Sequence, residues 1–305
     1  MAKRLGVMFR PEWPPEKLPA FARGAERDDF SELWLVEDCF LSGGPTMAAT
    51  ALQATNAITV GIGLLPAAVR NPAIVAMEIA GLARLHPNRF SAAFGHGVEP
   101  WMRQIGARPP DRLAALEETV AAVRALLHGE AVTTEGRHVH LDGVRLTHLP
   151  PEPPPILIGT TGPKALQAAA RAADGILLPE GSVPAAVRWA RETAGDPATT
   201  VVYAWLSLDD DRTAAAEALR PSIEGWMRFG LYRTLTDHAG LGDDGPADLE
   251  GDRIRALAVA GDARDCARSI AELWAAGADT VVLIPRHEDR AVQIARFAAE
   301  VRPLL

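Results

Sequence analysis

The stretch from Ala57 to Arg103 constrains the fold of this chain most. A short run rich in β-branched residues, Ile58 to Leu64, predicts a strand that is buried on both faces. Asn71-Pro72 begins a predicted helix, because a proline at an early helical position loses no hydrogen bond. A second strand is predicted from Arg89 to Phe94. The order strand, loop, helix, strand is the unit from which α/β folds are built.

The same alternation continues along nearly the whole chain. The predicted strands are 5–9, 30–36, 58–64, 89–94, 156–159, 175–178, 200–208 and 280–285. Helices separate most of them, and the clearest amphipathic one runs from Pro109 to Leu127. Eight strands separated by helices are what a (β/α)8 TIM barrel requires, and a doubly wound sheet is the alternative. A closing helix directly after the last strand, at Glu288 to Val301, favours the barrel.

Two stretches interrupt the alternation. Between Ala131 and Leu149, short apolar runs around Gly136 and Asp142-Gly143 predict one or two short hairpins, and Asp142-Gly143 is a good signal for a hairpin turn. Asp209 to Glu250 is long and mixed, and we expect Thr213 to Arg233 to be largely helical, divided at Arg220-Pro221. We therefore predict one barrel domain over residues 1–305, with a hairpin insertion around 131–149 and a helical insertion around 209–255.

Charge and composition exclude several classes of function. The net charge is −8 and the pI is about 5.5, without a stripe of lysine or arginine, which argues against nucleic acid or an anionic membrane as partner. Cys39 and Cys266 have no motif spacing, so we expect neither a disulfide framework nor a cysteine zinc site. No signal-peptide pattern follows Met1, and the longest apolar run is too short to cross a bilayer. We expect a soluble, cytoplasmic protein that acts on a small-molecule substrate.

Polar residues stand where predicted strands end, which is the end of a barrel that carries chemistry. Glu37 and Asp38 follow the second strand, and because they are adjacent, at most one points easily into the barrel mouth. His96 lies between Gly95 and Gly97, where it is well placed for hydrogen bonding or proton transfer. We predict Asp38 and His96 as catalytic residues and Glu37 as a cofactor-binding residue. The alternatives are an N-cap or loop acid for the carboxylates and a solvated loop residue for the histidine.

Two glycine-containing strand ends could bind a ligand through the backbone. Gly159-Thr160-Thr161-Gly162 comes between a strand and a helix, where hydroxyls, free N–H groups and the helix dipole suit a phosphate. An ordinary capped loop is the alternative. Gly61 and Gly63 leave room for a flat ligand against the strand, although plain close packing explains the pair equally well.

Other candidates carry weaker signals. His138 and His140 would share one face of a strand, but without a third ligand nearby we expect no metal site. Arg286-His287 could meet an anionic substrate group or simply be solvated. Three of the seven tryptophans lie near predicted strand ends and could line an aromatic pocket: Trp13, Trp34 and Trp101.

Four blocks of sequence resemble the bacterial luciferase-like family of flavin and deazaflavin oxidoreductases, over nearly the whole length. They are LWLVEDCF, VGIGLLPAAVRNPAIVAMEIAGLARLHPNRFSAAFGHGVE, PPILIGTTGPKALQAAARAADGILLP and GDARDCARSIAELWAAGADTVVLIP. Within this family the chain is most similar to the branch that uses the 8-hydroxy-5-deazaflavin coenzyme F420, which includes methylene-tetrahydromethanopterin reductase.

The resemblance implies a (β/α)8 barrel that forms a homodimer. It implies a non-prolyl cis peptide at Gly63-Leu64, backing the deazaflavin ring, and a coenzyme phosphate bound at Gly159 to Gly162. It also places His96-Gly97 beside the ring system or its side chain. Family dehydrogenases often have Asp-His after the second strand, whereas this chain has Glu37-Asp38.

The fourth-strand segment departs from the family's sugar-phosphate members, which have an acid directly after the glycine. This chain has Val98 there and Glu99 one residue later, so a sugar-phosphate substrate is not expected. The resemblance favours an F420-dependent oxidoreductase that moves a hydride between the coenzyme and a small organic substrate. A monooxygenase using reduced FMN is the first alternative, and a barrel that binds a ligand without catalysis is the second.

Overall fold

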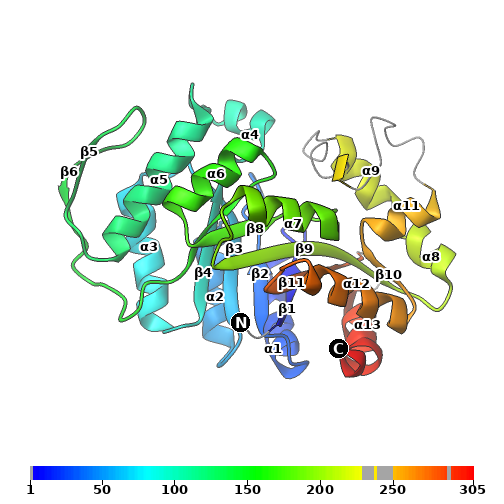
Figure 1. Cartoon of the computed structure of the whole chain (residues 1–305). Coiled ribbons are helices and arrows are strands. Elements are labelled where there is room, and N and C mark those ends of the chain that lie inside the picture. Colours follow the sequence, from blue (N-terminus) through cyan, green and yellow to red (C-terminus); the bar gives the residue numbers. More distant parts are fainter. Residues whose placement is uncertain (1–2, 229–236, 239–249, 287–289) are drawn as a thin grey trace.

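The computed structural model describes residues 3–228, 237–238, 250–286 and 290–305 (Figure 1). The strands are β1 (Arg4–Phe9), β2 (Glu32–Leu35), β3 (Thr59–Pro66), β4 (Phe90–Gly95), β5 (Val132–Glu135), β6 (His140–Val144), β7 (Ile156–Gly159), β8 (Gly175–Leu178), β9 (Thr199–Leu208), β10 (Val259–Gly261) and β11 (Thr280–Pro285). The α-helices are α1 (Leu18–Arg27), α2 (Gly44–Ala54), α3 (Pro72–Leu85), α4 (Glu99–Gln104), α5 (Arg112–Leu127), α6 (Pro163–Ala172), α7 (Pro184–Thr193), α8 (Arg212–Glu217), α9 (Arg220–Arg228), α11 (Gly251–Ala256), α12 (Ala263–Ala275) and α13 (Arg290–Arg296).

Eight parallel strands form a closed barrel, as the alternation predicted. Around the barrel the order is β9, β11, β1, β2, β3, β4, β7 and β8, and β8 pairs with β9 to close it. The first and last strands along the chain, β1 and β11, are neighbours, so the barrel takes in nearly the whole sequence. One strand was not predicted: β10 pairs with the far end of β9. Its three residues are too few to show a periodicity.

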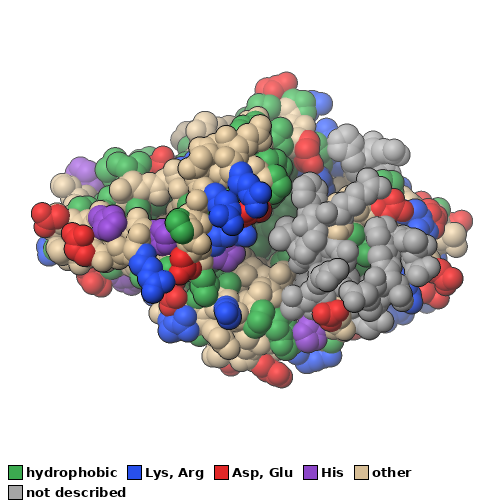
Figure 2. Space-filling model, turned by 90° about the horizontal axis from the view of Figure 1, so that it is seen from above, with side chains coloured by type: hydrophobic (Ala, Val, Ile, Leu, Met, Phe, Trp, Pro, Cys, Tyr) green, Lys and Arg blue, Asp and Glu red, His purple; other side chains and the backbone are tan. Residues whose placement is uncertain are grey.

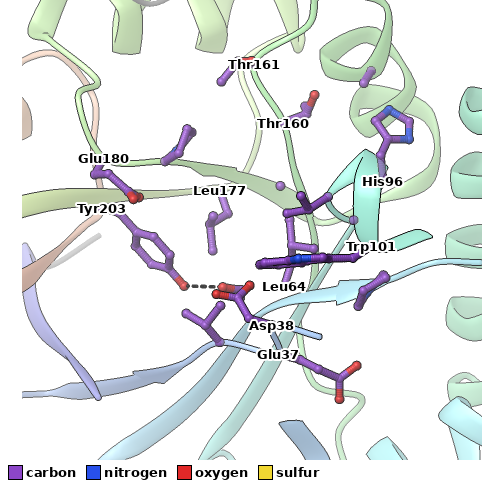
Figure 3. Close-up of a pocket in the computed structure, with 18 of the residues that line it drawn as sticks. Glu37, Asp38, Leu64, His96, Trp101, Thr160, Thr161, Leu177, Glu180 and Tyr203 are labelled. Atoms are coloured by element: carbon purple, nitrogen blue, oxygen red, sulfur yellow. Dashed lines mark hydrogen bonds between the residues drawn. The ribbon is translucent and has the colours of Figure 1, made fainter. Parts of the chain in front are cut away.

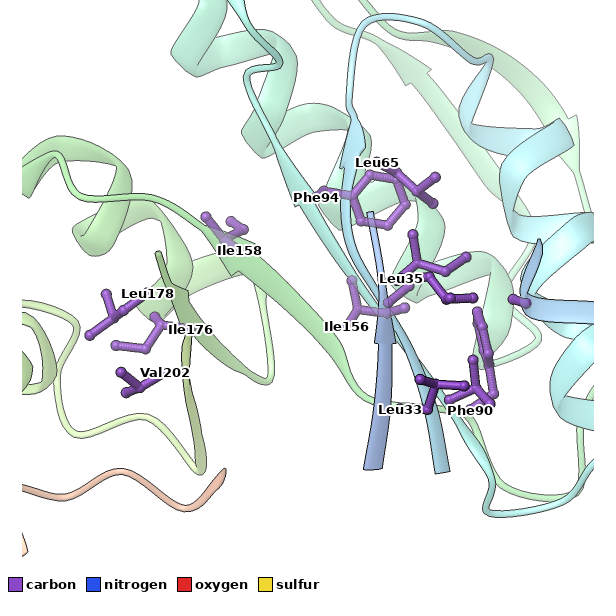
Figure 4. Close-up of a cluster of buried hydrophobic side chains, with 14 of the residues drawn as sticks. Leu33, Leu35, Leu65, Phe90, Phe94, Ile156, Ile158, Ile176, Leu178 and Val202 are labelled. Carbon is purple, nitrogen blue, oxygen red and sulfur yellow. The ribbon is translucent and has the colours of Figure 1, made fainter. Parts of the chain in front are cut away.

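The strands read as continuous apolar runs because both of their faces are buried. On β2, Leu33 and Leu35 pack outward against the helices, whereas Trp34 points into the barrel interior with Met8 and Tyr203. Figure 4 shows part of the outward cluster, with side chains from β2, β3, β4, β7, β8 and β9. Outward side chains therefore pack the strands against the surrounding helices, and interior side chains such as Trp34 fill the barrel below the cavity.

The predicted hairpin is present, but its turn is elsewhere. β5 and β6 pair in antiparallel fashion, and residues 136–139 connect them. The prediction of a turn at Asp142-Gly143 was wrong, because these residues lie within β6. There Gly143 has a φ of 60° and the register of the pair shifts, as in a β-bulge. The Asp-Gly signal indicates a residue in the left-handed conformation, and Gly143 adopts that conformation in a bulge instead of in a turn. In Figure 1 the hairpin lies to one side of the barrel.

The second insertion is helical where the structure describes it. α8 and α9 divide near Arg220-Pro221, as expected, and α11 follows before β10. The remainder of the predicted helix after residue 228, and residues 288–289 at the start of the predicted last helix, lie outside the described residues. Within the described part of the chain, none of the helices has both the length and the apolar character that crossing a membrane would take.

Candidate active site

A cavity of about 760 Å³ opens at the carboxyl ends of the barrel strands. Viewed from above the barrel, the surface is hollowed at its centre (Figure 2). Every site residue predicted from the sequence lines this cavity: Glu37, Asp38, Gly63, Leu64, His96, Gly97, Gly159, Thr160, Thr161 and Gly162. They lie in or directly after β2, β3, β4 and β7, which are consecutive around the barrel, so the closed sheet brings them together.

Glu37 and Asp38 point in different directions, as their adjacency predicted. Arg70 donates to both carboxylate oxygens of Glu37, at 2.5 and 2.6 Å, and the N–H of Gly44 at the start of α2 donates to the same group at 2.7 Å. The Glu37 side chain thus ties the loop after β2 to two neighbouring segments, and Figure 3 shows it directed away from Asp38. Its carboxylate is therefore already bonded within the protein. The carboxyl group of Asp38 remains on the cavity side.

The part of the cavity around Asp38 is acidic. Burial and, to a smaller extent, the nearby carboxylates of Glu12 and Glu180 raise the pKa of Asp38 to about 6, while Arg10 opposes them. Burial also raises the pKa of Glu180. Arg10 is held by Glu12, with guanidinium–carboxylate distances of 2.6 and 3.2 Å. No ion pair to Asp38 or Glu180 is found among the described residues. Near neutral pH the carboxyl group of Asp38 can therefore hold or release a proton.

Gly63 and Leu64 also form part of the cavity wall. Their peptide bond is cis, as the family resemblance implied, and the register with β4 shifts at this point. The buried hydroxyl of Tyr203 donates to the Gly63 carbonyl at 3.1 Å, a bond drawn in Figure 3. A Cβ added to Gly63 would lie 2.1 Å from that hydroxyl, so only glycine fits. Gly61 is different: it packs against the ring of Trp34, which is the close-packing alternative.

The start of α6 supplies polar groups to another part of the cavity. Gly162 is its N-cap residue and no side chain caps the helix, so the N–H groups of Lys164 and Ala165 are not used by a cap. Both residues line the cavity. The Gly162 N–H donates to the Thr160 hydroxyl at 3.2 Å, and a Cβ built on Gly162 would meet nothing closer than 4.0 Å. This open helix terminus can receive an anion.

His96 lies near this helix terminus. β4 and β7 are paired, so the segment after β4 that carries His96 adjoins the segment after β7 that carries Thr160. The imidazole Nδ1 is buried and has no hydrogen-bond partner among the described residues. Burial and the positive charge of Arg112 lower the pKa of His96, so its ring is neutral at neutral pH. In Figure 3, Thr160, Thr161 and His96 lie in the upper part of the pocket, and Asp38 and Tyr203 in the lower part.

The weaker candidates separate clearly. Trp101 lines the cavity, but Trp34 is buried beneath it. Trp13 is also buried, packed edge-on against Phe9, so the expectation of a three-tryptophan pocket was wrong for two of them. Arg286 interacts with Ser207 on β9, and His287 lies outside the described residues. No group of three potential metal ligands occurs in the part of the chain that the structure describes.

Sequence reasoning missed Arg10, Glu180 and Tyr203. Arg10 and Glu180 follow β1 and β8 as directly as Asp38 follows β2, so the same strand-end rule could have found them. Tyr203 gave no such signal, because it lies in the middle of a ten-residue apolar strand. Its role depends on a neighbour 140 residues away in the sequence.

Comparison with known proteins agrees with this architecture. The sequence pattern of the family described as "Luciferase-like monooxygenase" matches residues 4–280. A 5,10-methylenetetrahydromethanopterin reductase from Methanolobus tindarius is 27% identical over 302 residues, covering 91% of this chain and 92% of its own. An F420-dependent glucose-6-phosphate dehydrogenase from Nakamurella multipartita is 28% identical over 233 residues, covering 68% of each chain.

Solved structures share the fold. An F420-dependent secondary alcohol dehydrogenase in complex with an F420-acetone adduct superposes with a TM-score of 0.83 at 21% identity, over 100% of both chains. The FMN complex of the oxygenating constituent of 3,6-diketocamphane monooxygenase from Pseudomonas putida gives 0.77 at 18% identity, over 99% of this chain and 98% of its own. At such identities the likeness concerns the fold alone. The match from residue 4 to residue 280 is decisive for the family, and this chain belongs to the luciferase-like monooxygenase family of oxidoreductases.

Proposed function

We propose that the protein is an F420-dependent oxidoreductase that transfers a hydride between the deazaflavin coenzyme and a small organic substrate. The observation that carries the proposal is that two kinds of polar group line one cavity. The uncapped N-terminus of α6 lies in one part, and the carboxyl group of Asp38, whose pKa is raised, lies in another. The curated relatives at 27% and 28% identity, named as a methylenetetrahydromethanopterin reductase and an F420-dependent dehydrogenase, support the choice of coenzyme.

The residues present fit such a coenzyme. The N-terminus of α6, with Thr160, would hold the phosphate, since unpaired N–H groups and the helix dipole favour an anion. The wall at Gly63 and Leu64 would support the ring, and the buried, unpartnered Nδ1 of His96 would gain a hydrogen-bond partner. When bound, the coenzyme supplies the hydride chemistry, while the protein orients the reactants and excludes water.

Asp38 would handle the proton that accompanies hydride transfer. A carboxyl group with a pKa of about 6 is populated in both protonation states near neutral pH, which suits a general acid or base. In the direction of reduction, it would donate its proton to the substrate heteroatom that gains electrons; in the direction of oxidation, it would accept that proton. Tyr203 would position the wall at Gly63 without changing its own charge, because burial raises its pKa well above the usual value.

An oxygen-activating, FMN-dependent activity is the second candidate. It is favoured by structural neighbours such as the monooxygenase from Pseudomonas putida in complex with FMN. Both coenzymes carry a phosphate that suits the α6 terminus, so this feature does not separate them.

Equilibrium titration of the purified protein with oxidised F420 and with FMN, side by side, tests the proposal. We expect micromolar binding of F420 and negligible binding of FMN. A preference for FMN would contradict the proposal and support the monooxygenase. If neither coenzyme binds, both oxidoreductase proposals are contradicted, and a barrel that binds another ligand without catalysis is the remaining hypothesis.

A further inference from the structure

Three arginines surround one glutamate beside the cavity mouth. Glu99 begins α4, Arg103 lies one turn later, Arg108 lies in the next loop and Arg112 begins α5. We call Glu99, Arg103, Arg108 and Arg112 the Glu99 cluster. Arg112 itself lines the cavity, so the cluster continues its wall towards solvent.

The hydrogen bonds leave the ends of two guanidinium groups exposed. Arg103 and Arg108 both donate their Nε–H to the same oxygen of Glu99, at 2.9 and 2.5 Å. Within the described residues, the Nη atoms of neither arginine donate a hydrogen bond. Their side chains are 67% and 44% exposed. Glu99 thus contacts the Nε edge of both guanidinium groups, and both side chains remain partly exposed to solvent.

Arg112 completes the cluster from the cavity side. One of its Nη atoms lies 3.2 Å from the second oxygen of Glu99, and the other donates to the Gly97 carbonyl at 3.4 Å. The acidic neighbour of Arg112, Asp111, is engaged elsewhere, with the Ala114 N–H and with Arg137.

The cluster is positively charged on a chain whose net charge is −8. Three guanidinium groups face a single carboxylate, and Lys164 at the start of α6 also lines the cavity. In Figure 2, lysine and arginine side chains gather on one rim of the central hollow. A ligand with several negative charges, extending from the cavity over this rim, would satisfy the exposed Nη groups. A ligand that ends at its phosphate would leave them unused.

We propose that the Glu99 cluster binds the oligoglutamate chain of F420, beyond the phosphate held at α6. This inference rests on the proposed function, and it gives Arg103 and Arg108 a part in the preference for F420 over FMN. Arginine suits the role because its planar fork can meet a carboxylate with two parallel hydrogen bonds. FMN has no such chain, so the cluster would strengthen binding of F420 alone.

The test is fluorescence titration with two forms of the coenzyme, F420 with its glutamate chain and the same deazaflavin phosphodiester without glutamate. The proteins are the wild type, the double variant R103Q/R108Q, and R171Q as a matched control. Arg171 is an exposed arginine near the far end of α6, paired only with Glu117 among the described residues. Thermal unfolding of each variant checks that it is folded.

We expect the wild type to bind the glutamylated form more tightly, with an advantage that shrinks as salt is raised. R103Q/R108Q should weaken binding of that form by about threefold to tenfold, the effect of losing two partly exposed charge pairs. It should leave the form without glutamate unchanged, and R171Q should change neither. Equal binding of both forms by the wild type would overturn the inference while leaving the proposed function intact. Failure of both forms to bind would overturn both.

Discussion

Replacing Asp38 by asparagine should stabilise the protein at high pH. The folded state raises the pKa of Asp38 from 3.8 to about 6, so the ionised carboxylate is less favourable in the folded than in the unfolded chain. Two pKa units correspond to about 3 kcal/mol, at about 1.4 kcal/mol per unit. Because the side chain faces a wet cavity, solvent screening reduces the expected gain to about 1–2 kcal/mol.

The sign and the pH window follow from linkage. Above pH 6 the folded protein carries the full cost of the ionised group, and the cost disappears below the unfolded pKa of 3.8. Asp38→Asn should therefore raise the melting temperature at pH 8 by about 2–8 °C, given about 2–4 °C per kcal/mol for a chain of this size. The gain should fall to about half at pH 5. Circular dichroism melts at the two pH values measure it.

Glu37→Gln is the matched control, because it changes the neighbouring carboxylate in the same way. Its charge is paired with Arg70 and its side chain is only 10% exposed, so neutralising it leaves Arg70 with Glu78, at 3.4 Å, as its remaining carboxylate partner. We expect a loss of about 2–3 kcal/mol at pH 8, opposite in sign to Asp38→Asn. If Asp38→Asn fails to raise the melting temperature at pH 8, or raises it equally at both pH values, the reasoning about the acidic wall is wrong.

Three further predictions concern single residues. Tyr203→Phe removes a buried side-chain donor to the Gly63 carbonyl and should lower the free energy of unfolding by about 1–2 kcal/mol, measured by urea denaturation; an unchanged value would contradict the role of this bond. Gly162→Leu adds a side chain in open space with ordinary backbone angles, so titration should show F420 binding weakened at least about tenfold while the melting temperature stays nearly constant; unchanged binding would place the phosphate elsewhere. The expected homodimer should bury the exposed apolar side chains of α3, among them Met77 (59% exposed) and Leu85 (76%), so Met77→Glu should shift sedimentation towards the monomer, and a monomeric wild type would refute it.

The sequence was sufficient for the barrel because its signal is repeated and local. Each strand is a short apolar run between helices, and eight such units leave few other ways to bury both faces of a parallel sheet. The exceptions are elements without a local pattern. β10 is too short for a periodicity, and the Asp142-Gly143 signal specifies a left-handed residue without saying whether a turn or a bulge uses it.

The site was predictable as far as it depends on strand ends. Asp38, His96 and Gly162 each follow a predicted strand, and barrel closure alone brings them to one cavity. What the sequence could not supply is the direction of each side chain and its partners. Glu37 and Asp38 look equivalent in the sequence, yet Arg70 binds the carboxylate of Glu37, and the carboxyl group of Asp38 faces the cavity. The raised pKa of Asp38 likewise depends on its burial in the folded protein and on Glu12 and Glu180, which come from other strand ends.

The central claim is that one cavity holds the coenzyme phosphate at α6 and the reacting ring near Asp38. A crystal structure of the protein with oxidised F420 tests it most directly. We predict the phosphate within hydrogen-bonding distance of the Lys164 and Ala165 N–H groups and the ring against Leu64, with Asp38 on the substrate side. A coenzyme bound outside this cavity, or bound with its phosphate away from α6, would contradict the account.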